Sequence, residues 1–359
     1  MSDRQVSGDQ ERVVAGASRE AERRGRRPVL QPTDCGLAVT YRCNSRCQMC
    51  NIWRKPPTRE HPPEAYYRLP ESLRYVNLSG GEPFLRDDLV EIVRVVTERC
   101  HRPRIQISSN GLLPERIERQ VRAILTETRA DLNVGVSIDG IGDTHDQIRG
   151  VPGGFERAVE TLRRVWAAGL RDGGINFTIS DRNAHELQAV YSLAKEMGVE
   201  FSMTIVHNSE HYFDTQDNHF TARDMLRRQM DCVLSSELRS ANPKRWYRAY
   251  YASGLLNYAC GRSARYPCDA ANGFFFLSPS LDVYPCVVLD GPMGNLGEST
   301  FDHIWSSKQA EAARRKVASC DERCWMGCTA FSVMRRNLPK VGAWAISRKL
   351  LAHLGHRVV

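Results

Sequence analysis

Three cysteines, Cys43, Cys47 and Cys50, lie within the eight residues CNSRCQMC. Three thiolates so close in sequence can ligate three irons of a [4Fe–4S] cubane, and the fourth iron then lacks a protein ligand. A small molecule can bind at that open iron. The alternative is a zinc site, which takes four protein ligands, and no fourth cysteine or histidine lies close by.

The spacing of these cysteines, with three and then two residues between them, resembles that of the radical S-adenosylmethionine (radical SAM) enzymes. In that family, SAM chelates the open iron and is cleaved reductively to a 5′-deoxyadenosyl radical, which abstracts hydrogen from the substrate. The resemblance implies a SAM-binding [4Fe–4S] cluster, SAM itself and an electron donor of the flavodoxin or ferredoxin type. Many relatives carry an aromatic residue where this chain has Met49, whose flexible thioether can fill the same space.

The composition is that of an ordinary globular protein, with 26% charged and 42% hydrophobic residues among 359. The twelve cysteines are clustered, which favours metal binding in a reducing cytoplasm over a disulfide scaffold. No signal peptide or run of eighteen apolar residues is visible, so we expect a cytoplasmic protein without a membrane span. The net charge of +8 reflects abundant arginine, and no aromatic-rich basic patch indicates nucleic acid.

Six strand-like segments alternate with amphipathic segments in the first two thirds of the chain. We expect strands at residues 37–41, 75–78, 104–108, 132–138, 174–179 and 200–206, and helices at residues 87–98, 115–126, 155–168 and 184–197. This alternation predicts βαβ units and a parallel sheet. Six units are two short of an eightfold barrel, and the radical SAM resemblance implies a partial (β/α)6 TIM-like barrel.

Polar motifs follow three of these strands, at the end where such barrels place their chemistry. They are SGGEP, SSNG and VSIDG, and a further motif, HDQIRG, comes after them. The resemblance implies that they supply the cofactor-binding residues Gly80, Gly81, Glu82, Ser109, Asn110, Ser137, Asp139 and Arg149. Glycines let backbone N–H groups approach a ligand, and an arginine can pair with the SAM carboxylate. Taken singly, each motif is equally well explained as a polar cap of a strand end.

The loop HNSEHYFDTQDNH, residues 207–219, follows the last expected strand and is rich in titratable groups. We expect it at the mouth of the barrel, where His207, Glu210, His211 or Asp214 could hold substrate or act as a general base. Glu210 and His211 are the catalytic candidates that we retain. A solvated polar loop is the alternative.

A second group of cysteines lies near the C-terminus, where Cys268 and Cys286 flank an expected hairpin that turns near Ser280. Cys320, Cys324 and Cys328 follow in CDERCWMGC. The group resembles the SPASM or shorter twitch extension of radical SAM enzymes, which implies one auxiliary [4Fe–4S] cluster. Cys268 and Cys286 are its securest ligands, and the pattern leaves open which two of the last three complete it. A zinc site with four cysteines is the alternative.

These features divide the chain into four expected parts. Residues 1–34 are a disordered or loosely structured tail, residues 35–240 the partial barrel, residues 241–332 the auxiliary-cluster domain and residues 333–359 a basic helix that packs against it.

An auxiliary cluster with four protein ligands has no open iron, so its natural use is to take an electron from a substrate radical. The chain resembles aminocyclitol dehydrogenases of antibiotic pathways in this respect. We therefore expect dehydrogenation of a small sugar-like molecule, such as a carbohydrate, aminocyclitol or nucleoside.

Three other outcomes use the same machinery. A sugar epimerase would need a hydrogen donor, for which Cys260 is the best candidate, although a buried apolar role also explains that residue. A sugar-acid decarboxylase is the second outcome. The third, a maturase of ribosomally made peptides (RiPPs), is disfavoured by an N-terminal segment too short for a winged peptide-binding domain. A zinc-stabilised binding protein is the alternative that is not an enzyme.

Overall fold

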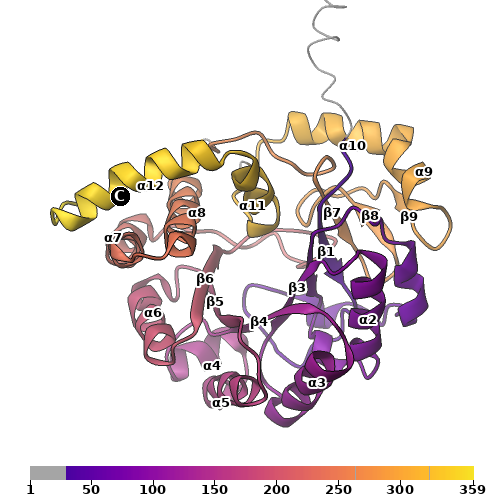
Figure 1. Cartoon of the computed structure of the whole chain (residues 1–359), viewed down its shortest axis with the longest axis horizontal. Coiled ribbons are helices and arrows are strands. Elements are labelled where there is room, and N and C mark those ends of the chain that lie inside the picture. Colours follow the sequence, from indigo (N-terminus) through magenta and orange to yellow (C-terminus); the bar gives the residue numbers. More distant parts are fainter. Residues whose placement is uncertain (1–29, 263, 323) are drawn as a thin grey trace, which may run out of the picture. The chain divides into compact units, whose positions relative to one another are not determined.

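The computed structural model describes residues 30–359 except residues 263 and 323, and residues 32–359 form one compact unit (Figure 1). Most of the expected N-terminal tail, residues 1–29, therefore lies outside the described residues. The expected boundaries at residues 240 and 332 do not separate compact units, and they stay predictions about sequence modules.

A nine-stranded sheet with the order β6-β5-β4-β3-β2-β1-β7-β8-β9 forms the centre of this unit. Its first six strands are mutually parallel. They are β1 (Asp34–Ala38), β2 (Tyr75–Ser79), β3 (Arg104–Ser109), β4 (Asp131–Ser137), β5 (Gly173–Ile179) and β6 (Glu200–Ile205). The sheet ends at β6 and β9 without closing on itself. The expected mixed α/β fold with an open parallel sheet is thus confirmed.

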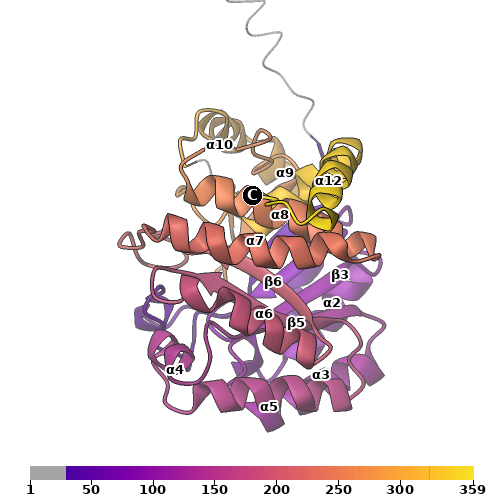
Figure 2. The same cartoon turned by 90° about the vertical axis from the view of Figure 1, so that its left-hand side faces the viewer.

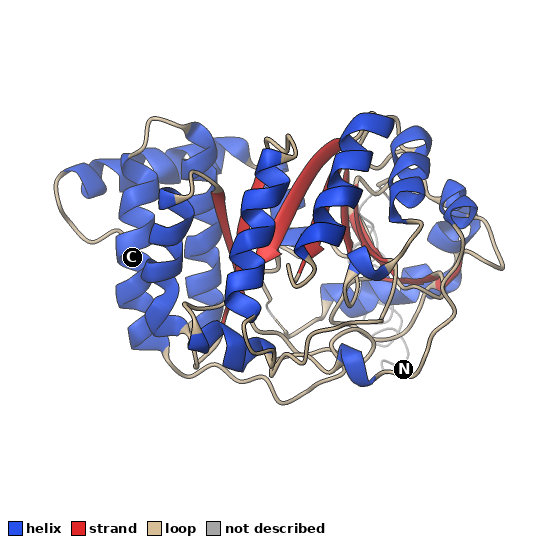
Figure 3. Cartoon of the chain, turned by 90° about the horizontal axis from the view of Figure 1, so that it is seen from below, coloured by secondary structure: helices blue, strands red, loops and turns tan. Residues whose placement is uncertain are grey.

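Helices cover the outer face of the strands, as Figures 2 and 3 show. They are α2 (Leu89–Arg99), α3 (Pro114–Glu127), α4 (Asp143–Arg149), α5 (Gly154–Ala167), α6 (Leu187–Glu196), α7 (Arg223–Arg239) and α8 (Pro243–Ala259). Short 3-10 turns lie at η1 (Ile52–Arg54), η2 (Pro63–Arg68), η3 (Pro83–Leu85) and η4 (Ala184–Glu186). In α3, Ile117, Val121 and Ile124 are buried, and their spacing is that of one helical face turned toward the core.

Strand β1 begins three residues earlier than expected and ends at Ala38. All five of its residues are buried because it lies between β2 and β7, where both faces of the sheet are covered. The apolar residues after Ala38, which the sequence placed in the strand, instead lead into the cysteine loop.

The expected hairpin is formed by β7 (Phe274–Leu277) and β8 (Asp282–Tyr284), and β9 (Gly294–Asn295) pairs with β8. Because β7 pairs with β1, this hairpin extends the barrel sheet. Phe275 packs on Phe301 and Trp305, whereas Phe274 and Phe276 face Gly36. Aromatic packing on both faces thus joins the hairpin to its surroundings.

Four more helices complete the chain: α9 (Phe301–Ser306), α10 (Lys308–Ala318), α11 (Gly327–Arg336) and α12 (Leu338–His353). The expected basic C-terminal helix corresponds to α12, which lies beside α7 and α8 (Figure 1). Arg239 donates to the carbonyl oxygen of Ala352 at 2.9 Å, and Lys349 donates to that of Leu238 at 2.8 Å. Among the described residues, no helix is both long enough and apolar enough to cross a bilayer.

Candidate functional site

A cavity of about 220 Å³ lies where the first cysteine loop meets the carboxyl ends of the parallel strands. Cys43, Cys47 and Cys50 all line it. Polar residues from the strand ends line it too, and they are Ser79, Gly80, Gly81, Ser108, Ser109, Asn110, Ser137, Thr178 and Thr204. The structure therefore brings the three cysteines together with most of the residues expected to bind the cofactor.

Gly80 and Gly81 hold the base of the cysteine loop. The Gly81 N–H donates to the carbonyl oxygen of Thr40, and the Glu82 N–H donates to that of Arg42, each at 2.8 Å. A Cβ atom on Gly81 would lie 2.1 Å from the Arg42 oxygen, so only glycine permits this backbone approach. The N–H groups of Gly81 and Glu82 are thus used within the chain, contrary to the expectation that free N–H groups here face a ligand.

Glu82 is fully buried and is not among the residues that line the cavity. Its carboxylate accepts hydrogen bonds from the Asn110 N–H (2.7 Å), the Ser109 hydroxyl (3.0 Å) and the Phe84 N–H (3.2 Å). Burial raises the pKa of Glu82 to about 7, although these hydrogen bonds oppose the shift. Glu82 fixes the end of β3, and its expected contact with SAM stays a prediction.

Asn110 and Ser109, which are both hydrogen-bonded to Glu82, line the cavity. The Asn110 side-chain amide donates to Asn44 Oδ1 at 2.7 Å, which links the end of β3 to the cysteine loop. Ser137 lines the cavity at the end of β4. These three residues are placed where the sequence expected a cofactor contact, and that role remains a proposal.

Arg149, the last residue of α4, connects Asp139 to the cysteine loop. Its Nη2 lies 2.5 Å from the Asp139 carboxylate, and its Nη1 donates to Cys47 Sγ at 3.7 Å. The Arg149 carbonyl oxygen accepts from the Arg46 N–H and the Ser45 hydroxyl, each at 2.9 Å. Arg149 therefore holds the loop and brings a positive charge to the thiols.

Asp139 is fully buried and is not among the cavity-lining residues. Its Oδ1 accepts a hydrogen bond from the Thr178 N–H at 2.6 Å. The sequence expected this residue to contact cofactor or substrate, whereas the structure makes it the counter-ion of Arg149. A motif at a strand end cannot show whether a carboxylate points into the cavity or behind it.

The first three thiols are suited to a metal cluster. Burial raises the pKa of Cys43 and of Cys50 to about 12, and the Arg149 charge opposes the rise. Metal binding replaces the thiol protons, and the Arg149 charge would offset part of the negative charge that three thiolates bring. These donors fit an iron–sulfur cluster that has one face toward the cavity.

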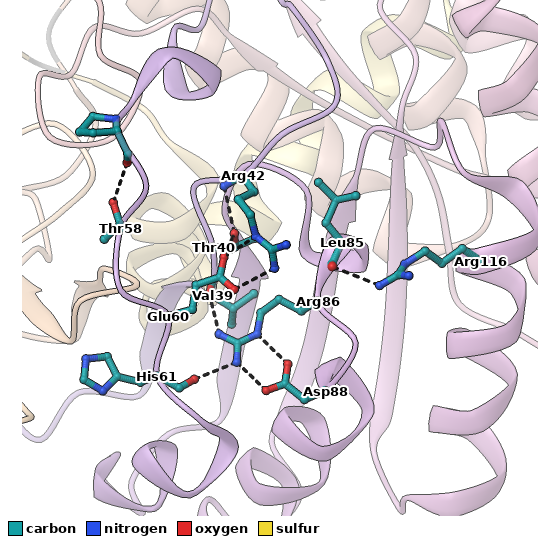
Figure 4. Close-up of polar contacts among 11 residues, drawn as sticks. Val39, Thr40, Arg42, Thr58, Glu60, His61, Leu85, Arg86, Asp88 and Arg116 are labelled. Atoms are coloured by element: carbon teal, nitrogen blue, oxygen red, sulfur yellow. Dashed lines mark hydrogen bonds and ion pairs between the residues drawn. The ribbon is translucent and has the colours of Figure 1, made fainter.

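The segments on both sides of the loop are anchored by Arg86 (Figure 4). Its Nη1 donates to the Val39 carbonyl oxygen at 3.0 Å, its Nη2 donates to that of His61 at 2.8 Å, and Asp88 pairs with the same guanidinium at 2.6 Å. Arg42 pairs with Glu60 at 2.8 Å beside it. No sequence motif pointed to this network, because its members come from three separate segments.

The three expected catalytic residues do not line the cavity. His211 pairs with Asp290 (2.8 Å) and contacts the Cys286 carbonyl oxygen (3.1 Å), so it ties the 207–219 loop to the second cysteine region. Glu210 is exposed, and a hydrogen bond with Asp290 raises its pKa. Cys260 caps α8 and accepts from Arg227 at 3.7 Å. Their catalytic roles remain predictions that this geometry does not support.

Trp53, His207, Tyr212 and Met326 are among the cavity-lining residues that are not candidate site residues in the sequence analysis. Tyr212 donates to the Gly80 carbonyl oxygen at 3.2 Å. The position of His207 at the end of the last expected strand is the available signal for that residue, whereas nothing in the sequence points to Met326.

The second cysteine group gathers five thiols from separate segments: Cys268, Cys286, Cys320, Cys324 and Cys328. Burial raises the pKa of Cys324, and each of the other four thiols raises it further. Burial also raises the pKa of Cys328 and sets that of Cys286 at about 12. Four other thiols thus lie near Cys324, and of the five only Cys268 is exposed; this set suits a cluster with four protein ligands.

Among the residues that the structure describes, no three His, Cys, Asp or Glu side chains lie close enough to hold a single metal ion. The assignment to iron–sulfur clusters therefore rests on the number and type of the donors and on the following comparisons.

Two family profiles match the chain. Residues 37–194 match the radical SAM superfamily, and residues 268–329 match the iron–sulfur cluster-binding domain SPASM. Together they imply a SAM-binding [4Fe–4S] cluster, SAM and an auxiliary cluster.

Curated relatives extend over most of the chain. It is 27% identical to the mycofactocin maturase of Mycolicibacterium smegmatis in an alignment 312 positions long that covers 81% of this chain and 76% of that protein. It is 28% identical to the AdoMet-dependent heme synthase of Methanosarcina barkeri in an alignment 275 positions long that covers 70% of this chain and 76% of that protein.

A solved structure shares the fold. The crystal structure of Streptococcus suis SuiB bound to S-adenosylmethionine matches with a TM-score of 0.60 and 14% identity, over 79% of this chain and 68% of that one. At this identity, the likeness concerns the fold alone.

Proposed function

We propose that this chain, which carries a radical SAM domain followed by a SPASM iron–sulfur domain, is a maturase that modifies a peptide. The mycofactocin maturases support this reading because their similarity spans both domains. The comparisons do not support the sugar-like substrate expected from the sequence, nor the epimerase or antibiotic-pathway assignment. The peptide alternative, which the sequence analysis ranked lower, fits them better.

The span of the similarity is the observation that carries the proposal. The matches to mycofactocin maturases cover 81% of this chain, against 70% for the heme synthase of Methanosarcina barkeri. A match of that length includes parts of both the radical SAM domain and the SPASM domain.

The residues of the chain contribute to this reaction by holding the cysteine loop and by placing polar and charged groups around the cavity. When bound, SAM and the first cluster supply the 5′-deoxyadenosyl radical that abstracts hydrogen from the substrate. Gly81 and Arg149 hold the cysteine loop in place. Asn110 and Ser137 present polar groups at the cavity wall, and the Tyr212 hydroxyl donates to the Gly80 carbonyl oxygen.

Met326 supports an oxidative outcome, because it lines the cavity and lies between Cys324 and Cys328 in the sequence. The second cysteine region thus reaches the wall of the substrate space. A substrate radical formed there would lie near the group suited to accept its electron, so the net reaction we propose is oxidation of the peptide.

The test compares substrate classes on the full chain, reconstituted anaerobically with iron and sulfide. SAM and a reductant are supplied together with short peptides encoded beside the gene, with iron porphyrins, or with glycosides and aminocyclitols. The expected result is 5′-deoxyadenosine in step with a mass loss on a peptide, absent in the Cys47→Ser variant. Coupled turnover of only a porphyrin or a sugar would contradict the proposal.

A further inference from the structure

His207 presents an unused hydrogen-bond acceptor at the cavity. The residue lies two positions after the end of β6, lines the cavity and is 6% exposed. Its Nδ1 lies 2.6 Å from the carbonyl oxygen of Ile205. A carbonyl oxygen only accepts, so Nδ1 carries the proton and Nε2 carries a lone pair. That Nε2 is buried and has no hydrogen-bond partner among the described residues.

The imidazole ring is held firmly in this orientation. It stacks on Tyr258 with ring centroids 5.0 Å apart and an angle of 5° between the planes. Asn218 fixes the backbone at the same point by donating to the His207 carbonyl oxygen at 2.8 Å. Rotation of the ring would break the stack and the hydrogen bond to Ile205 together. The direction of Nε2 is therefore set before any ligand arrives.

An unpartnered buried acceptor destabilises a folded protein, so its presence in a cavity wall needs an explanation. Burial lowers the pKa of His207 to about 4. The ring therefore stays neutral near pH 7, and it is a weak base. A hydrogen bond that Nε2 receives from a bound molecule would satisfy the group without a proton transfer.

A second unpartnered group lines the same cavity. The Nε1–H donor of Trp53 is buried without a partner among the described residues. The guanidinium groups of Arg46 and Arg54 each lie 4.7 Å from the centre of the Trp53 ring, which holds the indole in place. The lining of the cavity thus includes one fixed acceptor and one fixed donor.

From this geometry we propose that His207 is a substrate-binding residue whose Nε2 accepts a hydrogen bond from an N–H or O–H group of the substrate. The inference deepens the proposed function, on which it rests for the class of substrate. A peptide group carries both an N–H donor and a carbonyl acceptor, so it complements His207 and Trp53. The bond would fix which hydrogen of the substrate faces SAM.

Two variants separate the hydrogen bond from the packing of the ring. His207→Phe keeps a ring to stack on Tyr258 but removes the acceptor, and His207→Gln restores an acceptor near the position of Nε2. Exposed His219, which does not line the cavity, supplies the matched control His219→Phe. Steady-state kcat and KM are measured with the peptide that the wild-type protein modifies, together with the ratio of 5′-deoxyadenosine to product.

The expected KM for His207→Phe is about tenfold higher than for the wild type, the effect of one lost buried hydrogen bond. A larger excess of 5′-deoxyadenosine over product should accompany it, because hydrogen abstraction from a loosely held substrate is less efficient. His207→Gln should recover most of the affinity, and His219→Phe should behave as the wild type. A His207→Phe protein with unchanged KM and coupling would overturn the inference.

A chemical probe tests the free Nε2 without any substrate. Diethyl pyrocarbonate acylates neutral imidazole nitrogens, and the modified residues are mapped by mass spectrometry on the anaerobic holoenzyme. His145 is the buried control, since it does not line the cavity and its Nδ1 lone pair already accepts the Asp139 N–H at 3.1 Å. His207 should be modified faster than His145, and slower modification of His207 would contradict the inference.

The two proposals can fail separately. If the wild-type protein turns over only an iron porphyrin or a sugar, the peptide assignment fails, and the same variants are measured with that substrate. A rise in KM for His207→Phe would then still support the hydrogen bond. If a peptide is modified and the His207→Phe protein binds it as well as the wild type does, the peptide assignment stands and the role of His207 is wrong.

Discussion

Cys43, Cys47 and Cys50 come from one loop of eight residues that borders the cavity, whereas the five cysteines of the second group come from separate segments around β7, β8 and α11. None of those five thiols lines the cavity, and Met326 is the one described residue of that region that does. The first group has too few thiols to cap a cubane, and the second has more than enough. The contrast suggests one site built to exchange a ligand and one built to stay closed.

The two cysteine groups also differ in the contacts that hold them in place. The first loop is held by single side chains and backbone contacts, with Arg149, Arg86 and Gly81 at its base. The second group is embedded in packed aromatic residues, such as Tyr251 stacked near Trp325 and Phe331. We therefore expect changes near the first group to affect cofactor binding first, and changes near the second to affect stability first.

Loss of one thiol from each group gives the largest expected contrast. Cys47→Ser should lower 5′-deoxyadenosine formation by at least about a thousandfold, as loss of a group central to the reaction does. It should also leave about four irons per chain in place of about eight. Cys286→Ser should lose a similar amount of iron but still cleave SAM, although product formation fails. Iron and sulfide analysis with chromatography of the nucleoside measures both; retained SAM cleavage in Cys47→Ser would break the comparison.

The Arg149–Asp139 pair gives the next largest effect. Arg149→Met leaves Asp139 as an unpaired buried carboxylate, which should lower the free energy of unfolding by about 3–5 kcal/mol. The double variant Arg149→Met/Asp139→Asn should recover most of that stability without recovering SAM affinity. Denaturant titration and SAM binding together check this. A double variant with normal SAM binding would show that Arg149 supports the fold only.

Gly81→Ala tests the close backbone contact under the cysteine loop. Its Cβ would meet the Arg42 oxygen at 2.1 Å, so we expect a loss of about 1–3 kcal/mol together with weaker SAM cleavage. Gly342→Ala is the matched control, because it lies inside α12 with no atom within 4 Å of the added Cβ. That change should be neutral or stabilising by up to about 1 kcal/mol. Equal behaviour of the two variants would contradict the role of Gly81.

The last predicted effect is a pH dependence of folding stability that arises from two buried histidines near the parallel strands, His145 and His207. Burial lowers the pKa of His207 and of His145 to about 4 from 6.5. The unfolded chain then binds protons that the folded chain does not, so stability is complete above about pH 6.5 and falls as the pH drops toward 4. His207→Phe should remove up to about 1.4 kcal/mol per pH unit from this fall.

Urea titration at several pH values between 4 and 7.5 measures that slope, with His219→Phe as the control. An unchanged slope in His207→Phe would show that the imidazole is protonated as readily in the folded chain as in the unfolded one.

The sequence predicted the parallel strands well because their apolar patterns are local. Strands β2 to β6 begin within one residue of the expected positions. The expected bounds of β1 were wrong because an aspartate such as Asp34 is typical of a loop. Asp34 is paired with Arg335, which is distant in the sequence. The cysteine motif likewise predicted the first site, because the spacing of its three ligands is itself a local sequence pattern.

Local sequence patterns could not predict which way the side chains point, nor could they predict the substrate. Glu82 and Asp139 lie behind the cavity wall, and His211 turns toward Cys286; these outcomes depend on contacts between distant segments. The sugar-like substrate is inferred from the natural use of an auxiliary cluster as an electron acceptor, but the cluster ligands do not determine which molecule enters the cavity. His207 was passed over because a polar loop gives no sign of which residue is buried.

The central claim is that the first cysteine group leaves a coordination position for SAM and the second does not. The most direct test is electron paramagnetic resonance of the reduced, anaerobic protein with and without SAM, repeated on Cys47→Ser and Cys286→Ser. We predict that SAM changes only the signal that Cys47→Ser removes and that the signal of the second group is unaffected. A signal from the first group that is indifferent to SAM, or a second-group signal that shifts when SAM is added, would contradict the account.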